Sequence, residues 1–151
     1  MDLSITKTKK LGYLAKELME MDFNCPRHEI IIHGKSFDCE VDDQSRNSYS
    51  LYLYETGENR EIASIYMVLY DNNCVKLKEL RVEKSFQRKG LGSYLMEQII
   101  NKFDDKEIQL AIDFWSGTPS SVIKSFYEKY GFVMMDKNDD QLMYRKPTEG
   151  N

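Results

Sequence analysis

Most of this chain follows one of two patterns of apolar positions, one typical of strands and the other of helices. Between Tyr49 and Tyr54, Leu51 and Leu53 alternate with tyrosines, as in a strand with one buried face. After Gly90, apolar residues recur at helical spacing, as in a helix with one buried side. Strands are expected over residues 30–32, 49–54, 61–70, 75–82, 108–114, 132–135 and 141–145, and helices over 7–21, 90–103 and 118–131.

Polar segments separate these elements. Residues 56–59 predict a turn that makes the strands on either side antiparallel partners, and residues 71–73 predict a second turn. Residues 42–47 have the polar composition of a loop, and the tail at 147–151 is expected to be flexible. Because no repeat or linker interrupts the chain, residues 1–151 are predicted to form a single domain.

The strongest chemical signal lies where the strand ending at Val82 leads into the helix that begins near Gly90. The connecting segment ends in Gln87-Arg88-Lys89-Gly90-Leu91-Gly92. Glycines at such a turn let the backbone approach a ligand closely. The first N–H groups of a helix have no acceptor within the helix, and the helix dipole is positive there. With Arg88 and Lys89 adding positive charge, the segment predicts a site for a phosphate or diphosphate.

Three kinds of glycine-rich phosphate loop can be compared with it. A Walker loop needs a Lys-Ser/Thr pair that does not follow Gly92, so magnesium-nucleotide hydrolysis is disfavoured. A dinucleotide fingerprint needs a third glycine where this chain has Leu95. The pattern Gln87-x-x-Gly90-x-Gly92 resembles the loop with which the GNAT superfamily of N-acetyltransferases holds the diphosphate of acetyl-CoA. A nucleotide-binding protein of another type remains an alternative, which predicts affinity for ATP or NAD.

A second motif supports this resemblance. Phe126-Tyr127-x-x-x-Gly131-Phe132 is similar to the motif that ends the next helix of the same family. The resemblance extends from about residue 48 to residue 146 and is less clear for residues 1–47. It implies an α/β (α+β) fold with a mixed, mostly antiparallel sheet flanked by helices.

The resemblance also implies how acetyl-CoA would be held. The backbone of Leu80, Arg81 and Val82 would pair with the amide-bearing pantetheine arm, as a peptide adds to a strand edge. The loop would bind the diphosphate, and Ser116 stands where the family often has an asparagine that contacts the arm. The implied loop residues are Gln87, Arg88, Lys89, Gly90, Leu91, Gly92 and Ser93.

Catalysis needs a proton donor for the departing thiolate and a base for the amine. Tyr127 is the expected general acid, because a phenol keeps its proton at neutral pH; its alternative role is packing of the helix. Lysines 76 and 78 stand where relatives often place the base, so Glu79 and Asp113 are the candidates. Strict alternation places Glu79 on the opposite face from Lys78, unless a bulge redirects it. Either carboxylate could instead be an ordinary surface group.

Composition narrows the function further. The formal charge of −4 and the pI near 5.3 argue against a nucleic-acid-binding protein, which should have a basic face. No apolar run is long enough to span a membrane, and no signal peptide is evident. The three cysteines indicate reduced thiols and a cytoplasmic location, and no metal site is expected.

The sequence therefore predicts an acetyl-CoA-dependent N-acetyltransferase that acts on a primary amine by direct attack. The acceptor could be a small molecule or a protein, and the enzyme could be a monomer or a homodimer. The alternative is a non-catalytic acyl-CoA-binding or protein-interaction module with the same fold.

Overall fold

The computed structural model describes residues 27–112, 120–136 and 139–148. The predicted helix over residues 7–21 lies outside the described residues. The strands are β1 (Arg27–Ile32), β2 (Lys35–Asp42), β3 (Ser48–Glu55), β4 (Glu61–Leu69), β5 (Cys74–Val82), β6 (Glu107–Ala111), β7 (Val133–Asp136) and β8 (Asp139–Arg145). The helices are the short 3₁₀ segment η1 (Lys84–Phe86), α2 (Leu91–Lys102) and α3 (Ser120–Glu128).

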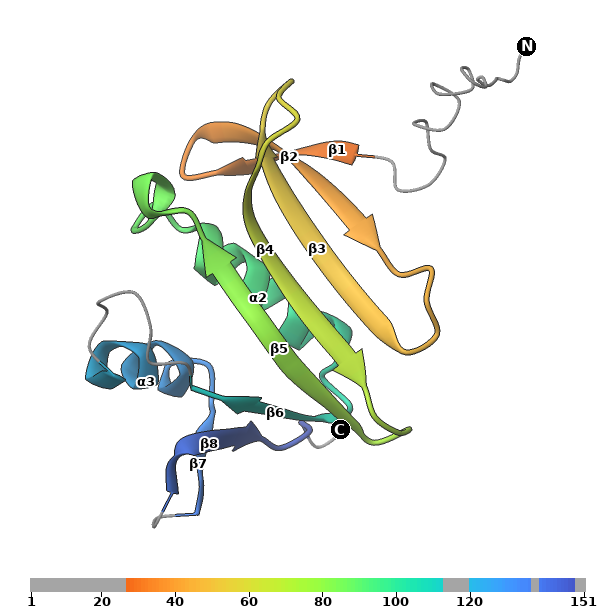
Figure 1. Ribbon diagram of the computed structural model, residues 1–151, viewed down its shortest axis with the longest axis vertical. Coiled ribbons are helices and arrows are strands. Elements are labelled where there is room, and N and C mark those ends of the chain that lie inside the picture. The colour runs from red at the N-terminus through yellow and green to blue at the C-terminus, as the bar shows by residue number, and fades with distance from the viewer. Residues whose placement is uncertain (1–26, 113–119, 137–138, 149–151) are drawn as a thin grey trace.

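The eight strands form one sheet in the order β1-β2-β3-β4-β5-β6-β8-β7 (Figure 1). Strands β5 and β6 are parallel, whereas the other neighbouring pairs are antiparallel. Helix α2 makes the crossover that a parallel pair requires. The predicted fold class, a mostly antiparallel mixed sheet flanked by helices, is confirmed.

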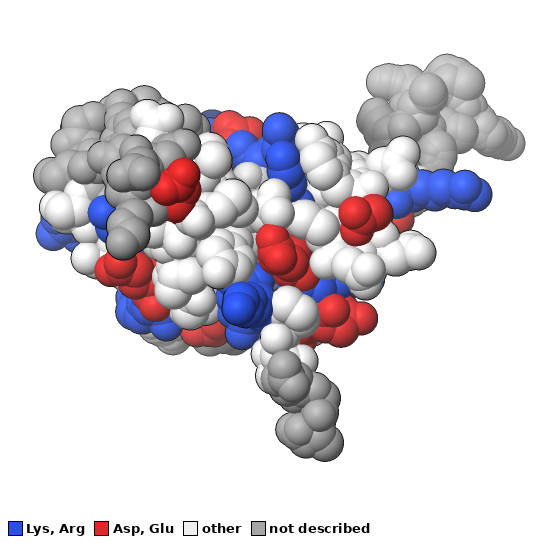
Figure 2. Space-filling view, turned by 90° about the horizontal axis from the view of Figure 1, so that it is seen from below, with Lys and Arg blue, Asp and Glu red and all other residues white. Residues whose placement is uncertain are grey.

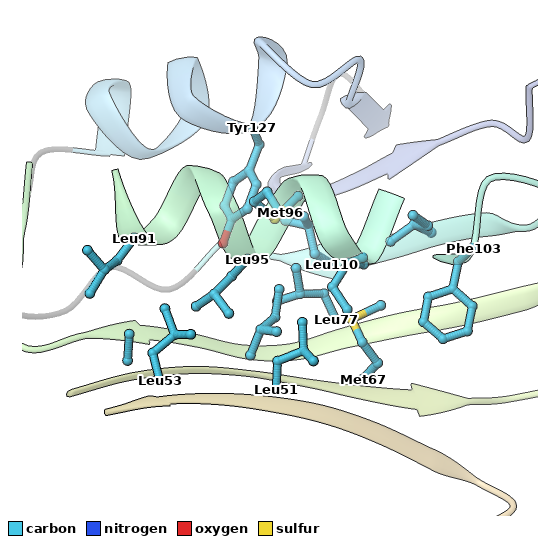
Figure 3. Close-up of a cluster of buried hydrophobic side chains, with 14 of the residues drawn as sticks. Leu51, Leu53, Met67, Leu77, Leu91, Leu95, Met96, Phe103, Leu110 and Tyr127 are labelled. Atoms are coloured by element: carbon cyan, nitrogen blue, oxygen red, sulfur yellow. The ribbon is translucent and has the colours of Figure 1, made fainter. Parts of the chain in front are cut away.

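The core lies between α2 and one face of the sheet (Figure 3). The buried side of α2 contributes Leu91, Leu95, Met96 and Ile99. On the sheet, Leu53 and Met67 are fully enclosed. Because the connection from β5 to α2 is short, running only from Glu83 to Gly90, this packing fixes the position of the glycine-containing turn within it.

Strand β2 was not predicted from the sequence. Its inward residues Phe37 and Cys39 are buried, but they alternate with Asp38, Glu40 and Asp42. These carboxylates give the segment the composition of a loop, although their spacing is that of a strand with one solvent-facing side. The polar connection after it is short, as expected, because β3 begins at Ser48.

Strands β5 and β6 pair along only part of their length. Their pairing runs from Cys74 opposite Glu107 to Leu77 opposite Leu110, whereas β5 continues to Val82. Figure 1 shows the two strands diverging beyond this point. In the described structure, the β6-facing edge of β5 is therefore open from Lys78 to Val82.

Strand β5 also contains an irregularity on its other edge. Tyr66 of β4 is opposite Glu79, whereas the next residue, Met67, is opposite Leu77. Lys78 is thus the extra residue of a β-bulge. The bulge breaks the alternation, so that Lys78 and Glu79 are both exposed.

Charges of both signs are intermingled over the described residues of the face in Figure 2. Among the described residues, no helix is long and apolar enough to cross a membrane. That part of the chain also contains no group of three or more His, Cys, Asp or Glu side chains arranged to hold a metal.

Candidate functional site

The segment between β5 and α2 is fastened at both of its ends. The Glu83 N–H donates to the Ile62 carbonyl at 2.8 Å, and the Glu83 carboxylate pairs with Arg60. The Gln87 side-chain amide donates to the Val82 carbonyl at 3.0 Å. Gln87 therefore ties the loop back to the end of the strand. Its predicted contact with the cofactor remains a prediction.

The turn into α2 uses two left-handed backbone conformations. Arg88 has φ 64° and Gly90 has φ 89°. Gly90 is the N-cap of α2, and no side chain caps the helix. The N–H groups of Leu91, Gly92 and Ser93 therefore have no acceptor within the helix. The Arg88 and Lys89 side chains are exposed and lie in the same turn. The unpaired N–H groups and the two positive charges together could bind an anion.

The two glycines of the motif are in different surroundings. A Cβ at Gly90 would lie only 2.7 Å from Cε1 of His33, so a larger residue would displace that ring. A Cβ at Gly92 would lie 3.7 Å from Phe126 and from Val82, which is ordinary contact. Gly90 is thus favoured by its backbone conformation, and a side chain there would also have to displace the His33 ring, whereas the space at Gly92 would accept an alanine.

The open edge of β5 leads directly to this turn. Leu80, Arg81 and Val82 pair with β4 on one side. The Arg81 guanidinium donates to the Glu61 carboxylate at 2.7 Å, which holds its side chain against β4. Among the described residues, no strand pairs with the backbone groups on the other edge, which could accept an extended, amide-bearing partner. Leu80, Arg81 and Val82 thus share this edge, and their pairing with the pantetheine arm remains a prediction.

Tyr127 lies inside the protein and is only 8% exposed. Its ring makes edge-to-face contacts with Phe126 and Phe132, with centroid distances of 5.3 and 5.8 Å. In Figure 3 it extends from α3 toward α2, and its hydroxyl ends near Leu95. The packing role considered from the sequence is therefore present, and the role as an acid remains a prediction.

Of the two candidate bases, only Glu79 lies among the described residues. Glu79 is exposed and lies opposite Tyr66, which is 40% exposed. The neighbours of Tyr66 in β4, Ile65 and Met67, are fully buried on the α2 side, so Tyr66 and Glu79 share the other face. The bulge that could redirect Glu79 is thus present. Asp113 and Ser116 lie outside the described residues.

His33 was not among the residues predicted for the site. It occupies the turn between β1 and β2, far from the motif in sequence, yet its ring lies against Gly90. No spacing in the sequence indicates this contact, because it depends on how the β1–β2 hairpin curves in the folded protein.

The sequence matches a known protein family. The family profile described as an acetyltransferase (GNAT) domain matches residues 24–141. None of the curated proteins matches the sequence significantly.

Solved structures share the fold at low sequence identity. The PaiA N-acetyltransferase of Thermoplasma acidophilum, solved in complex with coenzyme A, is 24% identical, with a TM-score of 0.53 over 66% of this chain and 61% of its own. This chain therefore spans less than two thirds of that protein. The ribosomal-protein-S18-alanine N-acetyltransferase of Escherichia coli is 17% identical, with a TM-score of 0.55 over 72% of this chain and 74% of its own. Because the profile covers most of the sequence, the chain belongs to the GNAT acetyltransferase family, for which acetyl-CoA is the co-substrate.

Proposed function

We propose that this protein transfers the acetyl group of acetyl-CoA to a primary amine by direct attack. The observation that supports this most strongly is the continuity of two binding elements. The open edge of β5 at Leu80–Val82 leads, through a fastened turn, into the uncapped N-terminus of α2. An amide-bearing arm and a diphosphate are joined in that order in coenzyme A, so one ligand satisfies both elements.

The residues would divide the binding task as follows. The N–H groups of Leu91, Gly92 and Ser93 bind the diphosphate, and Arg88 and Lys89 add positive charge beside it. The bound thioester supplies an activated acyl group. Neither sequence motif contains a cysteine that could form an acetylated enzyme, so direct attack by the amine is favoured.

Tyr127 and a carboxylate would move the protons. The amine nitrogen forms a bond to the acyl carbon as the carbon–sulfur bond breaks, and the Tyr127 hydroxyl gives its proton to the departing sulfur. Glu79 first removes a proton from the substrate ammonium, directly or through a water molecule, to give the amine that attacks, with Asp113 as the alternative base. The second proton, which the nitrogen loses as the amide forms, restores the Tyr127 hydroxyl through solvent. The bulge at Lys78 supports Glu79, because it brings that carboxylate to the surface beside Tyr66.

Binding and turnover should be measured on the same protein. Isothermal titration with coenzyme A tests the loop, and release of free thiol over a panel of amines tests transfer. For Tyr127→Phe we expect kcat to fall roughly 100-fold, while KM for acetyl-CoA stays within about twofold. Tyr130→Phe is the matched control, because this tyrosine lies in the same segment and should leave kcat unchanged.

The outcomes separate the two functions. Coenzyme A binding without turnover on any amine would favour the non-catalytic module. Unchanged kcat in Tyr127→Phe would remove this residue as the acid. Glu79→Gln should abolish the acidic limb of the pH–rate profile. An unaltered profile would show that Glu79 is not the general base and would favour Asp113.

A further inference from the structure

The turn between β1 and β2 brings a histidine to the proposed diphosphate site. His33 and Gly34 form the turn, with φ of 50° and 80°, which is the pattern of a tight hairpin turn. In Figure 1 this end of the hairpin lies beside the segment that leads into α2. Cε1, Nε2 and Nδ1 of His33 lie 2.7, 3.0 and 3.1 Å from the position of a Cβ on Gly90.

The same hairpin makes a second contact with this segment. The Lys35 ammonium lies 5.7 Å from the centre of the Phe86 ring in η1. It also pairs with Glu55 of β3 at 3.8 Å. Two side chains of the hairpin therefore approach the loop, and the hairpin is positioned there by more than the histidine alone.

The His33 ring is available to a ligand. The residue is exposed, and within the described part of the chain no hydrogen bond or ion pair holds its nitrogens. Its contact is with a glycine that precedes the free N–H groups of α2. An imidazole can donate one hydrogen bond when neutral and two when protonated, and the protonated form also carries positive charge.

We propose that His33 is a binding residue for the diphosphate of coenzyme A, supplied by the β1–β2 hairpin in addition to the loop. This inference rests on the proposed binding of the cofactor at Gly90–Ser93. A diphosphate bound by the α2 N–H groups would lie next to the Gly90 backbone, which the imidazole also contacts. The requirement for glycine at position 90 then has a functional reason, because a side chain there would displace the histidine.

Protonation gives this contact a signature that packing alone lacks. Charged side chains close in sequence to His33 and to its contact residue Gly90 include Lys35, which pairs with Glu55, and Arg88 and Lys89 in the loop. Side chains of those types keep their charge between about pH 6 and pH 8, whereas histidine changes its charge there. Affinity for the diphosphate should therefore rise as the pH falls.

The test uses 3′-dephospho-CoA, because the 3′-phosphate of coenzyme A itself titrates at about pH 6. Isothermal titration at about pH 6 and about pH 8 compares the wild type, His33→Gln and His28→Gln. His28 is an exposed histidine of β1 and serves as the control. We expect the wild type and His28→Gln to bind roughly tenfold more tightly at the lower pH, and His33→Gln to bind equally at both.

Two kinds of failure can be told apart. If the wild type binds 3′-dephospho-CoA but His33→Gln keeps the full pH dependence, the role of His33 is overturned while the loop assignment stands. Tighter binding by His33→Gln at both pH values would also contradict it, since the ring would then obstruct the site. If the wild type does not bind at all, the cofactor site itself is wrong.

Discussion

Gly90 and Gly92 belong to the same motif, yet their replacement by alanine should have opposite effects on stability. In Gly90→Ala the new residue must adopt φ 89°, and its Cβ would meet the His33 ring at 2.7 Å. A left-handed conformation costs a residue with a Cβ about 1–2 kcal/mol. The exposed ring can rotate away, so we expect the backbone to account for most of the loss.

Gly92 lies in the first turn of α2, where its Cβ would make only ordinary contacts at 3.7 Å. Alanine is preferred over glycine within a helix by about 0.5–1 kcal/mol. The two variants should therefore differ in unfolding free energy by about 2 kcal/mol, or by roughly 4–8 °C in Tm for a chain of this size.

Thermal and urea unfolding without ligand measure this difference directly. Equal Tm values for the two variants would refute the reasoning about Gly90. The double variant His33→Ala/Gly90→Ala measures the steric part, because it should recover only the fraction of the loss that comes from the ring.

Three further predictions concern strain, packing and pH. Arg88→Gly should raise the unfolding free energy by about 0.5–1 kcal/mol, because glycine adopts φ 64° without strain, and it should weaken coenzyme A binding. Arg88→Ala should weaken binding without the gain in stability. Leu95→Ala should cost about 2–5 kcal/mol in urea unfolding, because Leu95 is fully buried between α2 and the sheet, and a loss below 1 kcal/mol would contradict that packing. Burial raises the pKa of the Cys39 thiol from 9.0 to about 11, against the opposing effect of its hydrogen bond with Tyr94. The folded state therefore keeps a proton that the unfolded chain loses, so stability should fall as the pH rises from about 9 toward about 11, and more steeply in the wild type than in Cys39→Ala.

The sequence predicted the elements that carry the motif. The glycine pattern between Gln87 and Gly92 located the start of α2, and the apolar spacing after it identified the helix that packs on the sheet. These features are local, since turn chemistry and helical periodicity are determined by neighbouring residues. The family profile confirms the resemblance that the two motifs indicated.

Features that depend on pairing between residues distant in the sequence were harder to predict. Strand β2 was overlooked because Asp38, Glu40 and Asp42 mask the alternation of its buried residues. The bulge at Lys78 could be raised only as a possibility, because register is a property of two strands together. The contact between His33 and Gly90 joins an outer hairpin to the loop, and nothing local to either residue indicates it.

A crystal structure of the protein grown with coenzyme A tests the central claim most directly. We predict that the amide nitrogens of Leu91, Gly92 and Ser93 lie within hydrogen-bonding distance of the diphosphate oxygens, while the pantetheine arm follows the β5 edge at Leu80–Val82. A coenzyme bound elsewhere, with those nitrogens facing solvent, would contradict the account of both the site and the reaction.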